Sequence, residues 1–129
     1  MNAIQFMRER LSKYPDISFE VTENSICVAP TNENGFSISM YVDRDEYEVY
    51  FEGWHENFQK PEQALECFAF GLSNSCRLKV IRRGNTPCQW TLESLENGTW
   101  IPDSQVGLLL VPFWRAKTVI YLQNNLIED

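Results

Sequence analysis

Apolar residues recur at helical spacing in two stretches of the chain. The first spans residues 2–13 and ends before Pro15, because proline disfavours helical backbone in the residue that precedes it. The second begins at about Pro61, where the fixed φ of proline suits a first helical position, and ends near residues 73–75. The residues expected to face the core are Ile4, Met7, Leu11 and Tyr14 in the first stretch and Leu65, Phe68, Ala69 and Leu72 in the second.

Alternation of apolar and polar residues predicts strands elsewhere. Asn97-Gly98 is typical of a type I′ turn and predicts a hairpin. Residues 107–111 are nearly all apolar, so we expect a central strand buried on both faces and ended by Pro112. The expected strands are residues 17–21, 26–29, 36–42 and 47–52 before the second helix, and 77–81, 88–95, 99–101, 107–111 and 118–122 after it.

These elements predict an α+β protein. A bent antiparallel β-sheet of about 7–9 short strands is packed by two helices, in the order α-ββββ-α-βββββ, because short turns between successive strands favour antiparallel pairing. The sequence has no internal repeat, low-complexity tract or linker, and its 129 residues match the size of one domain. We therefore expect residues 1–129 to form a single domain.

The formal net charge of −7 is unevenly distributed along the chain. Residues 1–66 hold 13 acidic and 5 basic side chains, whereas residues 67–129 hold 5 acidic and 6 basic ones. An acidic protein lacks the excess of cations that neutralises nucleic-acid phosphates, so nucleic-acid binding is not expected. A further interpretation of the acidic first half is that the protein is a regulator. It would dock on a basic partner through Glu46, Glu48, Glu52 and Glu56.

The chain shows neither a signal peptide nor an apolar run long enough to span a membrane, so we expect a soluble cytoplasmic protein. In that compartment the cysteines would be reduced thiols. None of them belongs to a Cys-x-x-Cys pair, and no nucleotide-binding or metal-binding motif occurs, so neither a metal nor a cofactor is predicted. The four cysteines are Cys27, Cys67, Cys76 and Cys88.

Three segments hold candidate binding residues. Trp54 and His55 lie in a strand-to-helix connection, and His55 is the only histidine available for acid–base chemistry. Arg82 and Arg83 belong to a run of cations that could hold a carboxylate or phosphate. Trp114 and Arg115 follow the apolar run and are residue types that interfaces favour. The simpler interpretations are that the tryptophans pack in the core, that His55 lies on the surface, and that the cations lie on a solvated face of the sheet.

No catalytic nucleophile motif accompanies the histidine, which favours a non-enzymatic protein. The leading hypothesis is a protein-binding accessory domain, chaperone- or immunity-like. The size, acidity and mixed α/β order of the chain are similar to those of bacterial type III secretion chaperones. This is a resemblance of overall organisation alone. The alternative is a small-molecule-binding domain, with or without enzymatic activity, in which Trp54, His55, Trp114 and Arg115 line one pocket. The partner would be a protein or a small molecule, and a homodimer is also compatible with the sequence.

Overall fold

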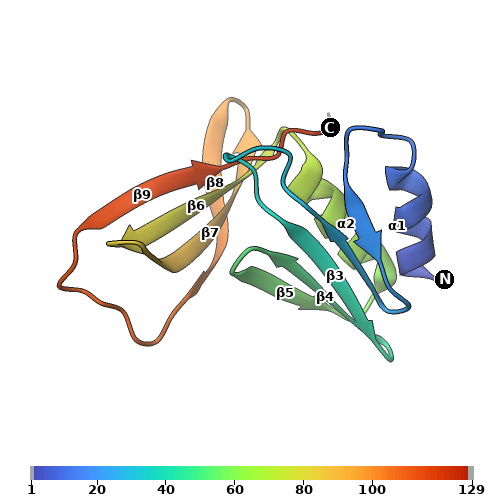
Figure 1. Ribbon diagram of the computed structural model, residues 1–129, viewed down its shortest axis with the longest axis horizontal. Coiled ribbons are helices and arrows are strands. Elements are labelled where there is room, and N and C mark those ends of the chain that lie inside the picture. Colours follow the sequence, from blue (N-terminus) through green and yellow to red (C-terminus); the bar gives the residue numbers. More distant parts are fainter. Residues whose placement is uncertain (1, 128–129) are drawn as a thin grey trace.

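The computed structural model describes residues 2–127 and is an α+β protein with two antiparallel sheets (Figure 1). Helix α1 (Ala3–Leu11) precedes β1 (Phe19–Val21), β2 (Ser25–Val28), β3 (Ile38–Asp43), β4 (Glu46–Phe51) and β5 (Trp54–Phe58). Helix α2 (Pro61–Leu72) leads to β6 (Cys76–Arg83), β7 (Thr86–Glu96), β8 (Thr99–Gly107) and β9 (Lys117–Leu122). No helix of the described residues is long and apolar enough to cross a membrane.

The predicted fold class is confirmed, and the strands divide into two sheets. The first sheet has the order β1-β2-β3-β4-β5, and the second has the order β8-β7-β6-β9. In Figure 1 the second sheet extends as a wing away from the two helices, which lie on the side of the first sheet. The first sheet and the helices hold most of the core, whose largest fully buried side chains include Trp54, Phe36, Phe51 and Phe68.

Local signals explain the element ends that were predicted well. The side chain of Asn2 accepts a hydrogen bond from the Gln5 amide and caps α1, and Pro61 opens α2. Asn97 and Gly98 both have positive φ, as a type I′ turn requires, and they join β7 to β8.

Three strand predictions were wrong. The strand expected over residues 99–101 continues to Gly107 as β8. Residues 54–58, expected to form a connection, are the edge strand β5, so the order is α-βββββ-α-ββββ. Residues 107–111 do not form a central strand, because β8 ends at Gly107 and the apolar residues that follow lie in a loop. An apolar run shows that burial would be favourable, but it does not show that this chain provides the burying partner.

The two sheets and the C-terminal segment meet through close contacts. Gly53, in the β4–β5 turn, lies against the ring of Trp90, and a Cβ atom added there would come within 2.4 Å of that ring. The buried side chain of Asn124 accepts a hydrogen bond from the Phe36 amide (2.9 Å) and donates one to the Gly71 carbonyl (3.0 Å). These contacts place the second sheet against the turn end of the first.

Candidate interaction site

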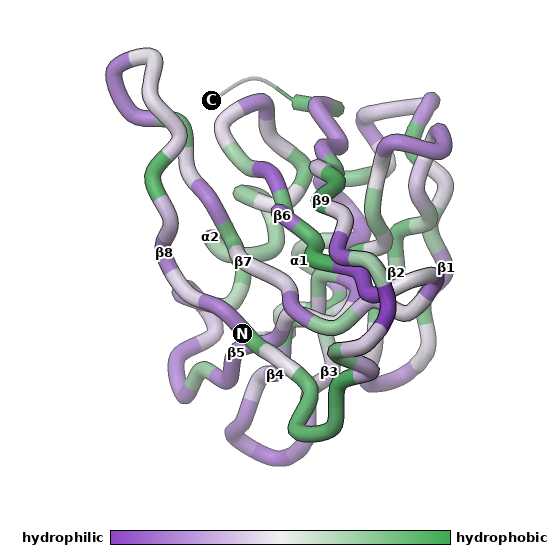
Figure 2. The backbone as a smooth tube through the Cα atoms, turned by 90° about the vertical axis from the view of Figure 1, so that its left-hand side faces the viewer, coloured by the Kyte–Doolittle hydropathy of each residue, from purple (hydrophilic) through white to green (hydrophobic). Residues whose placement is uncertain are grey.

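The connection between β8 and β9, residues 108–116, is the most unusual surface of the described chain; we call it the distal loop. Leu109 is 101% exposed and Leu110 is 90% exposed, while Phe113 and Trp114 are 75% and 72% exposed. Figure 2 shows this loop as a hydrophobic stretch at the end of the second sheet. Monomeric proteins seldom leave large contiguous apolar side chains in water, and such patches commonly mark interaction sites.

Backbone hydrogen bonds hold the loop at both ends. The Leu108 amide donates to the Cys88 carbonyl (2.9 Å), and the Gly84 amide donates to the Ala116 carbonyl (2.9 Å). Within the loop, Phe113 and Arg115 donate to carbonyls two and three residues earlier. The rings of Phe113 and Trp114 meet edge to face, with centroids 5.5 Å apart. The apolar side chains are therefore presented on a constrained backbone.

Cations surround the base of the distal loop. Antiparallel pairing of β6 with β9 sets Arg83 opposite Lys117 and Arg82 opposite Thr118, and Arg115 packs on Gly84. Among the described residues, none of these four cations has a carboxylate within ion-pair distance. Residues 76–92 and 104–127 contain no acidic residue at all. The rim therefore favours a partner with negative charge around an apolar surface.

The structure thus brings together four of the six predicted binding residues. Arg82, Arg83, Trp114 and Arg115 come from two separate sequence segments, and the β6–β9 pairing places both at one end of the sheet. Leu109 and Leu110, which are also exposed here, were predicted to lie in a buried strand and were not among the predicted binding residues.

Trp54 and His55 point to opposite faces of β5 and belong to neither a common pocket nor the distal loop. Trp54 is 1% exposed, stacks on Phe51 and donates from Nε1 to Ser104 Oγ (2.9 Å). His55 is exposed, and its ring lies tilted against that of Tyr50, with ring centroids 5.2 Å apart. The single aromatic and arginine pocket predicted as the alternative is therefore not formed.

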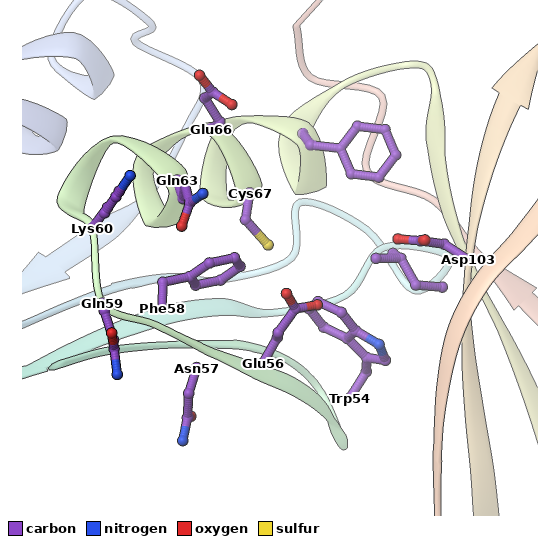
Figure 3. Close-up of a pocket in the computed structure, with 12 residues that line it drawn as sticks. Trp54, Glu56, Asn57, Phe58, Gln59, Lys60, Gln63, Glu66, Cys67 and Asp103 are labelled. Carbon is purple, nitrogen blue, oxygen red and sulfur yellow. The ribbon is translucent and has the colours of Figure 1, made fainter.

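A hollow separate from the distal loop, the α2 cleft, lies between α2, β5 and β8 and has a volume of about 730 Å³. Figure 3 shows Trp54 and Glu56 from β5, Cys67 from α2 and Asp103 from β8 around it. Burial, together with the negative charge of Asp103, raises the pKa of Glu56. Neither Cys67 nor Asp103 was among the predicted binding residues, because no local pattern indicates that β8 lies near α2.

The α2 cleft is poorly suited to nucleophilic catalysis. Burial, reinforced by the charges of Glu56 and Asp103, raises the pKa of Cys67 to about 12. At neutral pH the thiol is therefore protonated, and the protonated form is a weak nucleophile. His55, the only histidine, faces away from the cleft. What remains is a polar hollow with carboxylates and an aromatic floor.

The four glutamates proposed to form an acidic docking surface are also divided. Glu48 accepts a hydrogen bond from Tyr50 Oη (2.7 Å), and Glu52 accepts one from the Ser37 amide (2.9 Å), both on the outer face of the first sheet. Glu56 instead lines the α2 cleft. A partner therefore could not contact all four glutamates on one surface.

No family model, curated protein or solved structure matches this chain. Among residues 2–127, no three His, Cys, Asp or Glu side chains are grouped closely enough to bind a metal ion.

Proposed function

We propose that this is a non-enzymatic, protein-binding accessory protein, chaperone- or immunity-like, that works in the cytoplasm. Its distal loop inserts into an apolar groove of a partner protein that has acidic residues at its margin. The observation that carries the proposal is the exposure of Leu109, Leu110, Phe113 and Trp114 beside a cationic rim that has no carboxylate of residues 2–127 within ion-pair distance. Trp and Arg are the residue types most enriched where interfaces bind strongly.

The double substitution Leu109→Ser/Leu110→Ser tests the role of the distal loop. Each leucine contributes about 1.5–3 kcal/mol when it leaves water, so affinity for the partner should fall roughly a hundredfold or more. The melting temperature should stay within about 2 °C of wild type, because exposed leucines contribute little to folding. Quantitative affinity capture from a native lysate, followed by calorimetry with the purified partner, measures the loss.

Tyr14→Ser is the matched control. Tyr14 was predicted to face the core, but it lies beyond the end of α1 and is exposed, and it is far from the loop in the sequence. It should retain the partner. A partner captured equally by the loop variant would contradict the proposal. Binding of wild type to anionic phosphatidylglycerol vesicles, abolished by Leu109→Ser/Leu110→Ser, would also contradict it, because the loop would then dock on a membrane.

The α2 cleft supports a second candidate function, the binding of a small molecule. The observation that favours it is the hollow of about 730 Å³ bounded by Trp54, Glu56 and Asp103. Pockets of this size commonly hold small ligands. The carboxylates favour a cationic ligand or one rich in hydrogen-bond donors.

The electrostatic coupling across the cleft can be measured by pH titration. Asp103→Asn should lower the pKa of Glu56, because the neighbouring negative charge is removed. The larger part of the upward pKa shift, which burial causes, should persist. Since the folded-state pKa of Glu56 is raised, ionising it opposes folding, and its contribution to stability falls as pH rises through that pKa. Glu56→Gln should therefore be more stable than wild type at pH 7, and the gain should vanish at acid pH. Carboxyl-carbon NMR and thermal melts check both expectations, and an unchanged Glu56 titration in Asp103→Asn would contradict the coupling.

A further inference from the structure

Strand β9 is an open sheet edge without the features that normally block edge-to-edge pairing. It pairs with β6 on one side only, and Val119, Ile120 and Tyr121 are 41%, 36% and 48% exposed. After Lys117 the strand has no charged residue, no proline and no break in its register with β6. An apolar strand of this kind is a template for another strand.

The other three sheet edges of the described chain are protected. Strand β1 has only three residues, one of which is Glu20. Strand β5 carries His55 and Glu56. Strand β8 carries Pro102 and Asp103, next to an irregularity in its pairing with β7. Charges, proline, short length and bulges all discourage pairing, so β9 is the edge suited to it.

The direction of the backbone hydrogen bonds along β9 identifies which amides and carbonyls are available to pair with another strand. The Gly84 amide donates to the Ala116 carbonyl, one residue beyond the paired residues of β6 and β9 and in the same register. Because backbone groups alternate in direction along an antiparallel strand, the amides and carbonyls of residues 116, 118, 120 and 122 point toward β6. The amides and carbonyls of Lys117, Val119 and Tyr121 therefore point outward. At the next outward position, the Gln123 amide already donates to the Asn34 carbonyl (2.8 Å), which closes the edge.

We propose that two copies of this chain form a symmetric dimer by antiparallel β9–β9 pairing centred on Val119, which joins their second sheets into one eight-stranded sheet. In this register Val119 lies opposite Val119 of the second copy, and Lys117 lies opposite its Tyr121. It is the register in which all three outward residues of each strand find partners. Centring the pair on Lys117 would oppose two cations, and centring it on Tyr121 would bring Gln123, already bonded to Asn34, against the partner strand.

Side-chain pairing and charge also favour a second copy as the occupant. On the other face, Thr118 lies opposite Ile120 of the second copy, and no cross-strand pair combines like charges. Because the two β9 edges cover each other, the assembly closes as a dimer rather than growing into a fibre.

Opposite charges at position 119 provide a test specific to this register. Wild type should have twice the 15.1 kDa chain mass by light scattering. Val119→Lys and Val119→Glu should each weaken the dimer at least tenfold, because like charges then meet at the two-fold axis. Mixing the two variants should restore a dimer, since the charges become opposite. Val21→Lys places the same substitution on the β1 edge, at a valine that is 37% exposed, and should leave the dimer intact.

Amide hydrogen exchange tests the pairing without any substitution. The Val119 and Tyr121 amides should be protected in concentrated wild type and should exchange much faster on dilution below the dimer dissociation constant. A monomeric wild type at 0.1 mM would overturn the proposal, as would a dimer insensitive to both Val119 variants. A monomer that pairs only with a strand from another protein would overturn it too.

The proposed dimer and the proposed function can be tested separately, because a different substitution should remove each of them. Leu109→Ser/Leu110→Ser should remain dimeric while it loses the protein partner. Val119→Lys should become monomeric while it keeps its affinity for that partner. A loop variant that becomes monomeric would assign the distal loop to self-association and overturn the proposed function.

Discussion

Replacing Gly71 by valine should destabilise the protein by about 3 kcal/mol, the upper end for overpacking a well-packed core. Gly71 is buried in α2 against the first sheet, and a Cβ atom there would come within 2.5 Å of the Phe51 ring and 3.1 Å of Ile38 Cδ1. Both neighbours are 0% exposed, so neither can move into solvent. Valine adds branched carbons to that collision, and the gain in helix propensity over glycine, under about 1 kcal/mol, does not offset it.

Urea unfolding of Gly71→Val beside Gln63→Val measures this effect. Gln63 is exposed on the same helix, so its valine variant reports helix propensity without a collision and should lose only about 0.5 kcal/mol. Equal midpoints for the two variants would show that α2 does not approach the sheet as closely as described.

Replacing Asn124 by alanine should destabilise the protein by about 3 kcal/mol and lower its melting temperature by roughly 10 °C. The Asn124 side chain is 4% exposed and satisfies both the Phe36 amide and the Gly71 carbonyl. Alanine leaves both backbone groups buried without their partner. Because the side chain also joins the C-terminal segment to α2 and to the start of β3, we expect the base of β9 to loosen.

Thermal melts and amide exchange of Asn124→Ala check this expectation. Asn57→Ala is the control, because Asn57 is exposed on β5, and it should melt within about 2 °C of wild type. Asn124→Asp keeps an acceptor for the Phe36 amide but cannot donate to Gly71, so it should also be destabilised. Wild-type stability in Asn124→Ala would mean that water replaces the side chain and that the buried contacts are not required.

Much of the fold was predictable because its signals are local. Pro15 and Pro61 limit helices through their fixed backbone geometry, and Asn97-Gly98 supplies the two positive φ angles of a hairpin turn. Alternation along β4 correctly placed Val49 and Phe51 inside. These properties depend on a few neighbouring residues and need no knowledge of the rest of the chain.

The candidate site was predictable only in parts. Residue type alone identified four of the candidate binding residues, Arg82, Arg83, Trp114 and Arg115. Their proximity depends on the pairing of β9 with β6, which are separated by more than thirty residues of chain. The α2 cleft depends in the same way on β8 reaching α2 and β5, which places Asp103 near Glu56. Contacts between distant segments arise from the sheet order, and that order has no local sequence signal.

Local sequence patterns were sufficient to predict the fold class, the two helices, most strands and the accumulation of acidic residues in the first half. Three features depend on how distant segments pack together: the run after Gly107 faces water, His55 and Trp54 face opposite ways, and β9 is an open edge. The hydrophobicity of a residue gives only the free energy that its burial would contribute. Whether burial occurs depends on which surfaces the rest of the chain brings to it.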